Sequence, residues 1–95
     1  MSTKSDKIVV VFHADDCHFC HDYLPRFRRV AVKYRAFVAI KSVKLTDKNM
    51  ELLNRYKIGG FPSTCILAAD ESLIKKVEGA IDEKAIEKLF EKACS

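Results

Sequence analysis

The sequence lacks long apolar runs, internal repeats and low-complexity tracts. No stretch approaches the roughly 18 consecutive apolar residues that a membrane-spanning helix needs. Residues 1–7 are polar and lack the apolar core of a signal peptide, so we expect no export, no membrane contact and a cytoplasmic location. A chain of 95 residues leaves no room for a second domain. We therefore expect one domain over residues 1–95, with residues 1–6 as a flexible N-terminus.

A strong excess of one charge is also missing. The 17 lysines and arginines stand against 13 aspartates and glutamates, which gives a net charge of +4. This balance favours solubility and identifies no partner. The basic run from Arg26 to Arg35 is typical of the solvated face of a helix, with a site for an acidic partner as the alternative. Tyr23, Phe27 and Tyr34 have helical spacing, so they indicate a core and not a nucleic-acid surface.

Hydrophobic patterning in the first half of the chain predicts a strand, a long helix and a second strand. The continuous apolar run Ile8–Phe12 is typical of a strand buried on both faces. Apolar residues then recur at helical spacing, which predicts a helix that begins near Cys17 and carries a kink at Pro25. Residues 37–40, extending toward residue 45, predict a second buried strand.

The second half of the chain predicts a short helix, a hairpin and a final helix. Asp47 is the expected N-cap of the short helix, which buries Met50, Leu53 and Tyr56 and ends near Gly59. Residues 63–69 and 73–77 form an antiparallel pair, and residue 82 caps a helix that ends near residue 93. Right-handed crossovers give an α/β fold, β-α-β-α-β-β-α, with helices flanking a central mixed four-stranded sheet.

Cys17 and Cys20 stand three residues apart at the start of the predicted long helix. Neighbours at this spacing lie close enough to form a disulfide. Backbone N–H groups and the dipole at a helix start stabilise an anion, and lowering the Cys17 pKa from about 8.5 to about 7 would leave roughly half of it as thiolate. We therefore expect Cys17 to be the nucleophile and Cys20, one turn deeper, to be the resolving thiol.

Charges of both signs surround this cysteine pair. Protonated His18 or His21 would favour the Cys17 thiolate, whereas Asp16 and its neighbour Asp15 would oppose it. Together with Phe19, which lies between the cysteines, His18, His21 and Asp16 are the residues we expect to tune the redox potential. The sign of the net effect stays open.

The order of these features resembles the thioredoxin family over residues 7–93. The cysteine pair follows a buried strand, Pro25 lies five residues beyond Cys20, and Gly60-Phe61-Pro62 follows some forty residues later. The resemblance implies a thioredoxin-like fold and a thiol–disulfide oxidoreductase, with the Cys17–Cys20 disulfide in place of a cofactor. It also implies that Phe61 and a cis Pro62 bind an extended substrate chain beside the cysteines.

From these residues we expect a monomer that reduces protein disulfides and is itself recharged by an upstream reductase or dithiol donor. Three positions depart from the family's usual pattern. Val11 replaces a buried aspartate, Asp16 replaces a tryptophan, and His18-Phe19 replaces Gly-Pro between the cysteines. Without that aspartate, the base that deprotonates Cys20 is unassigned among His21, His18 and water.

Other functions compete with this interpretation. The chain could be a non-catalytic binding module that uses Phe61 and Pro62 or the basic helix. Cysteine and histidine side chains could also form a metal site, which we do not expect because no second Cys-x-x-Cys or histidine pair completes it (Cys17, Cys20, His13, His18, His21). The haem-attachment pattern Cys-x-x-Cys-His is set aside because haem attachment usually requires export and a mainly helical pocket.

Two further cysteines complete the set. Because 48% of the residues are hydrophobic and can form a core, the four cysteines do not indicate a secreted disulfide framework. We expect Cys65 to be a small core residue and Cys94 an exposed thiol near the C-terminal end of the sequence.

Overall fold

Four strands form one mixed sheet in the computed structural model, which describes residues 4–95. The strands are β1 (Ile8–His13), β2 (Ala39–Lys44), β3 (Ser63–Leu67) and β4 (Leu73–Glu78). Their order across the sheet is β2-β1-β3-β4, with β1 parallel to β2 and the other pairs antiparallel. This confirms the predicted four-stranded mixed sheet.

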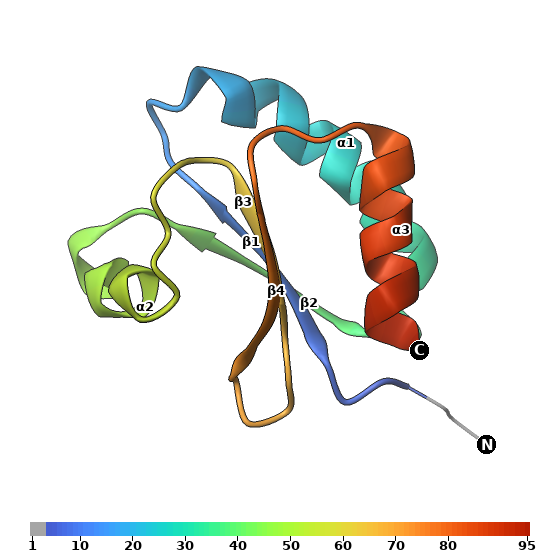
Figure 1. The fold of residues 1–95 in the computed structure, drawn as a ribbon. Helices are drawn as coiled ribbons and strands as arrows, with labels where there is room; N and C mark the ends of the chain where they lie inside the picture. Colours follow the sequence, from blue (N-terminus) through green and yellow to red (C-terminus); the bar gives the residue numbers. More distant parts are fainter. Residues whose placement is uncertain (1–3) are drawn as a thin grey trace.

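The helices cover both faces of the sheet, as predicted (Figure 1). The long helix α1 (His18–Tyr34) and the final helix α3 (Glu83–Cys94) lie on one face, and α2 (Met50–Arg55) lies on the other. The short 3-10 turn η1 (Asp47–Asn49) leads into α2. None of the helices in the described part of the chain is long and apolar enough to cross a membrane.

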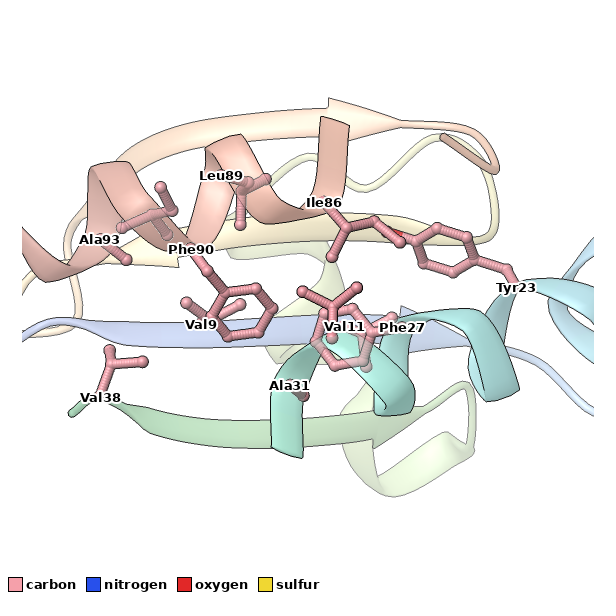
Figure 2. Packing of buried hydrophobic residues seen from close by; sticks show 12 residues of the cluster. Val9, Val11, Tyr23, Phe27, Ala31, Val38, Ile86, Leu89, Phe90 and Ala93 are labelled. Carbon is pink, nitrogen blue, oxygen red and sulfur yellow. The ribbon is translucent and has the colours of Figure 1, made fainter. Parts of the chain in front are cut away.

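Two apolar clusters hold these layers together, one on each face of β1. Alternate residues of a strand point to opposite faces, and here Val9 and Val11 face α1 and α3, while Val10 and Phe12 face α2. Figure 2 shows the larger cluster, in which the α3 side chains reach down onto β1 and α1 (Ile86, Leu89, Phe90, Ala93). Because β1 is buried on both faces, the prediction for residues 8–12 is confirmed.

The predicted start of the long helix is confirmed, as is one of the two predicted N-caps, that of the final helix. Cys17 is the N-cap of α1, and the helix continues through Pro25. The side chain of Asp82 caps α3 by accepting a hydrogen bond from the Ala85 N–H at 2.8 Å. The predicted flexible segment, residues 1–6, lies partly outside the described residues, and within it the Ser5 hydroxyl donates to the Ala93 carbonyl at 2.7 Å.

The structure corrects the prediction for the second strand. It begins at Ala39, and all of its residues are exposed or half-buried, because β2 lies at the edge of the sheet and, within the described part of the chain, pairs only with β1. Phe37, which precedes it, is 51% exposed. An apolar run therefore indicated the strand but not its place in the sheet.

The region around α2 also differs from the prediction. Thr46 and not Asp47 is the N-cap of the 3-10 turn, and no side-chain hydrogen bond caps either η1 or α2. Leu53 and Tyr56 are buried as expected, but Met50 is exposed. The chain leaves α2 at Tyr56, and Lys57 takes the left-handed backbone conformation (φ 54°), which removes the role expected for a glycine at position 59.

Replacing Phe90 tests which packing stabilises the fold. Its ring is fully buried against Phe27 and Tyr34, at centroid distances of 5.5 and 5.1 Å. We expect Phe90→Ala to lower the free energy of unfolding by about 3–5 kcal/mol, because it removes buried apolar surface and leaves a cavity. Phe37→Ala, at a half-exposed ring, should cost less than about 1 kcal/mol. Urea denaturation of both variants measures the difference, and equal losses would contradict this view of the core.

Candidate active site

Cys17 and Cys20 form a disulfide at the N-terminus of α1, with their Cα atoms 5.2 Å apart. Cys17 has an extended backbone (φ −86°, ψ 108°), and its Sγ accepts a hydrogen bond from the Cys20 N–H at 3.2 Å. The first N–H groups of a helix have no partner within the helix. The Cys17 sulfur therefore occupies the position that an N-cap oxygen normally fills, where negative charge is stabilised.

The two sulfur-bearing residues differ in access to solvent. Cys20 is 2% exposed, whereas Cys17 is half-buried. A sulfur that attacks a substrate disulfide must be reachable, and one that attacks within the mixed disulfide need not be. The geometry therefore fits Cys17 as the attacking thiol and Cys20 as the resolving thiol, and these roles stay predictions.

The residues expected to tune this pair are all exposed around it. Phe19 is 64% exposed, and its ring meets the His18 ring edge-on at a centroid distance of 5.9 Å. His21 and Asp16 are also exposed. The carboxylate of Asp15 forms a salt bridge with the Lys44 ammonium at 3.3 Å. The structure thus brings the predicted residues to one end of α1 with an apolar ring in solvent between the cysteines.

His13 lies at the end of β1, between the sheet and this site. Burial lowers its pKa, and the positive charges of Arg28 and Lys44 lower it further, against an opposing effect of Asp15. Its Nε2 lies 3.3 Å from the Ser42 hydroxyl. A histidine with a lowered pKa is largely neutral near pH 7, so His13 adds little positive charge at this end of the sheet. Within residues 4–95 no group of three histidine, cysteine or acidic side chains is placed to hold a metal ion.

Phe61 and Pro62 immediately precede β3, at the same end of the sheet as Cys17. Phe12, near the end of β1, pairs with Ser63 at the start of β3, so the loop before β3 lies beside the loop that leads to α1. The Phe61–Pro62 peptide bond is cis, Pro62 is buried and Phe61 packs against the α2 side of the core. The Pro62 carbonyl accepts a hydrogen bond from the Gly79 N–H at 2.7 Å, which anchors the loop to the end of β4.

A buried pair of hydroxyl groups is the feature that sequence reasoning missed. The Tyr23 hydroxyl and the Thr64 Oγ1 lie 2.7 Å apart, and both residues are fully buried. Thr64 is the cross-strand partner of Val11, and burial raises the Tyr23 pKa. Neither hydroxyl is a base near pH 7, so the pair does not replace a carboxylate that would deprotonate Cys20. A threonine within an aliphatic strand was the signal that could have identified it.

The two remaining cysteines are free. Cys65 is fully buried in β3, as predicted, and burial raises its pKa to about 11. The prediction that Cys94 is exposed is wrong, because it is only partly exposed and packs against the larger core cluster. Burial raises its pKa as well. The last turn of α3 therefore lies closer to the core than its place near the chain end suggested.

Comparison with known proteins places this geometry in a family. The model of the family Thioredoxin matches residues 1–92. The chain is 30% identical over 79 residues to protein disulfide-isomerase 2-3 of Arabidopsis thaliana, and 31% over 86 residues to protein disulfide isomerase-like 2-3 of Oryza sativa subsp. japonica. These matches cover 83% and 90% of this chain but 18% and 19% of the relatives, so the chain spans about a fifth of their length.

Solved structures show the same fold. The germline-specific thioredoxin Deadhead of Drosophila melanogaster is 27% identical, with a TM-score of 0.78, 95% of this chain covered and 81% of that chain. Fasciola hepatica thioredoxin has a TM-score of 0.80 at 22% identity, with 96% and 84% covered. Together with the Cys17–Cys20 disulfide, the family match and these structures support thiol–disulfide oxidoreductase chemistry at this site.

Thiol labelling distinguishes the two free cysteines. At about pH 8, with the Cys17–Cys20 disulfide intact, we expect iodoacetamide to label Cys94 and to leave Cys65 unmodified until the protein unfolds, because a thiol with a pKa of about 11 is almost entirely protonated. Peptide mass spectrometry with and without denaturant measures this. Labelling of Cys65 as fast as Cys94 in the folded protein would contradict it.

The same burial predicts a stability change at high pH. The unfolded Cys65 thiol ionises near pH 9.0 and the folded one near 11, so the unfolded chain loses its proton first as the pH rises. The stability contributed by this thiol is therefore present below pH 9 and is lost as the pH rises between these values. Urea denaturation of Cys65→Ala and the parent chain across this range isolates the effect.

Proposed function

Since the chain belongs to the thioredoxin family, we propose that it reduces protein disulfides through Cys17 and Cys20. One observation carries the proposal: Cys17 is the N-cap of α1, half-buried, and bonded to a Cys20 that is closed to solvent. The chemistry is thiol–disulfide exchange, and the direction of electron flow is the part we propose. Two cysteines left free in a small chain suit a reducing compartment.

The reaction begins with the reduced form. The Cys17 thiolate attacks one sulfur of the substrate disulfide, that bond breaks, and the leaving substrate sulfur takes a proton. Cys17 is then joined to the substrate in a mixed disulfide. Cys20 loses its proton to water or a nearby base, attacks the Cys17 sulfur, and releases the second substrate thiolate. Two electrons have passed to the substrate, and the Cys17–Cys20 disulfide of this structure is the product.

Substrate binding is assigned to the loop at Phe61 and Pro62. The loop before β3 lies at the same end of the sheet as Cys17, where an extended substrate chain can pair with its backbone. The Pro62 carbonyl and the Ser63 hydroxyl are already held by Gly79 and Gly60, so the loop is fixed before substrate arrives. A fixed loop lowers the entropy that binding costs.

We extend the proposal to the protein's surroundings. It acts as a cytoplasmic monomer, needs no cofactor beyond its own disulfide, and is returned to the dithiol by an upstream reductase or another dithiol donor. The thiol donor is required by the electron balance, because each turnover leaves the protein oxidised.

Substitution of Cys17 tests the proposal directly. We expect Cys17→Ser to reduce insulin disulfides no faster than dithiothreitol alone, because a hydroxyl cannot form the mixed disulfide. Cys94→Ser is the matched control and should keep the parent activity, since Cys94 takes no part in the exchange. Insulin turbidity with dithiothreitol as donor measures both. Unchanged activity in Cys17→Ser would overturn the assignment and would favour a non-catalytic binding module.

A further inference from the structure

A groove of about 500 Å³ runs between α1 and β2, away from the disulfide. Leu24 and Ile40 line its apolar part, Val32 lies at its margin with 55% of its surface exposed, and Arg28, Arg35 and Lys41 surround it with positive charge. Arg28 and Arg35 lie about 16 and 27 Å beyond Cys17 along the helix axis. A molecule bound in this groove would leave the disulfide accessible.

The groove follows the free edge of the sheet. It is lined by four consecutive residues, 39–42, at the start of β2. Val11, Phe27 and Ala31 line it as well, so the groove lies on the face of the sheet that α1 covers, beside the outer edge of β2. Among residues 4–95, β2 pairs only with β1, and its outer edge therefore offers backbone N–H and C=O groups to another strand.

The positive charges of α1 divide into two sets. On the side that faces α3, Arg29 and Lys33 form salt bridges with Glu83 and Glu87, at 3.9 and 3.2 Å. On the side that faces the groove, Arg28 and Arg35 are seven residues apart, about two turns, with Val32 between them.

The groove-side cations have no carboxylate partner. No salt bridge within residues 4–95 involves Arg28, Arg35 or Lys41. The salt bridges among the described residues thus pair the α3-facing cations of the helix with glutamates and leave the groove-facing cations unpaired. The groove side is complementary in charge to an acidic ligand.

We propose that this groove binds an extended acidic segment of a partner protein, which adds a strand to the free edge of β2. On the face of the sheet that α1 covers, its carboxylates would pair with Arg28 and Arg35, and an aliphatic side chain between them would lie on Leu24 and Ile40. Strand addition supplies main-chain hydrogen bonds, and side-chain pockets supply specificity. A second copy of this chain is a poor occupant, because the same cations would face one another across the interface.

The probe is a synthetic peptide without cysteine in which glutamate, valine and glutamate occupy every second position, so that all three face α1 when the peptide adds a strand. Fluorescence anisotropy of the labelled peptide measures its affinity for the full chain. We expect Arg28→Gln/Arg35→Gln to weaken binding about tenfold or more, because two charge-assisted contacts are lost. The matched control, Arg29→Gln/Lys33→Gln, removes the same charge from the same helix and should change affinity less than about twofold. Insulin reduction by both variants verifies that each is folded.

Amide hydrogen exchange locates the bound peptide. Strand addition should slow exchange at the outward-facing amides of β2. Equal weakening in both double variants would overturn the proposal, because it would show attraction to net charge only. Equal binding of the same peptide with lysine in place of glutamate, or of a single-stranded oligonucleotide, would also overturn it. So would protection at Phe61 and Pro62 in place of β2, or self-association of the free chain. Because the peptide holds no sulfur, these outcomes are independent of the exchange reaction.

Discussion

Strand β1 is hydrogen-bonded along both edges and buried on both faces, with α1 and α3 against one side and α2 against the other. The two clusters that enclose it form only if β2 and β3 flank it. Its last residues then lie beside the start of β3, and the short loop after it leads directly into α1. The position of Cys17 at a helix start, at the same end of the sheet as Phe61 and Pro62, follows from the burial of this one strand.

Features set by local pattern could be predicted from the sequence, and features set by long-range packing could not. The run at residues 8–12, the helix start at Cys17 and the cap at Asp82 are local signals, and each is confirmed. An apolar run does not show whether a strand lies at the centre or the edge, which is why the burial expected for β2 was wrong. Cys94 was misjudged for the same reason, because α3 packs along its whole length.

The site itself shows the same division. The pairing of Cys17 with Cys20 could be predicted from their spacing. The side chains that surround Val11 could not be predicted, because they come from distant parts of the chain. The structure places a hydroxyl there, Thr64, bonded to Tyr23 from the helix, and it directs the charge of Asp15 toward Lys44. A buried hydroxyl pair holds no charge near pH 7, so it does not supply the base that a carboxylate at position 11 would supply. The disulfide lies at the first turn of α1, whereas Arg28 and Arg35, which border the groove between α1 and β2, lie in and just after its second half.

The central claim is that electrons flow from Cys17 and Cys20 to substrate disulfides, and the redox equilibrium of this pair with glutathione tests it. The purified protein is equilibrated with glutathione buffers of known potential, free thiols are alkylated, and the fraction of Cys17–Cys20 disulfide is quantified by mass spectrometry. A reductant should have a potential of about −270 mV, the value of thioredoxins, because it must donate electrons to substrate disulfides. A potential of about −180 mV or higher, as in disulfide isomerases and oxidases, would contradict the account.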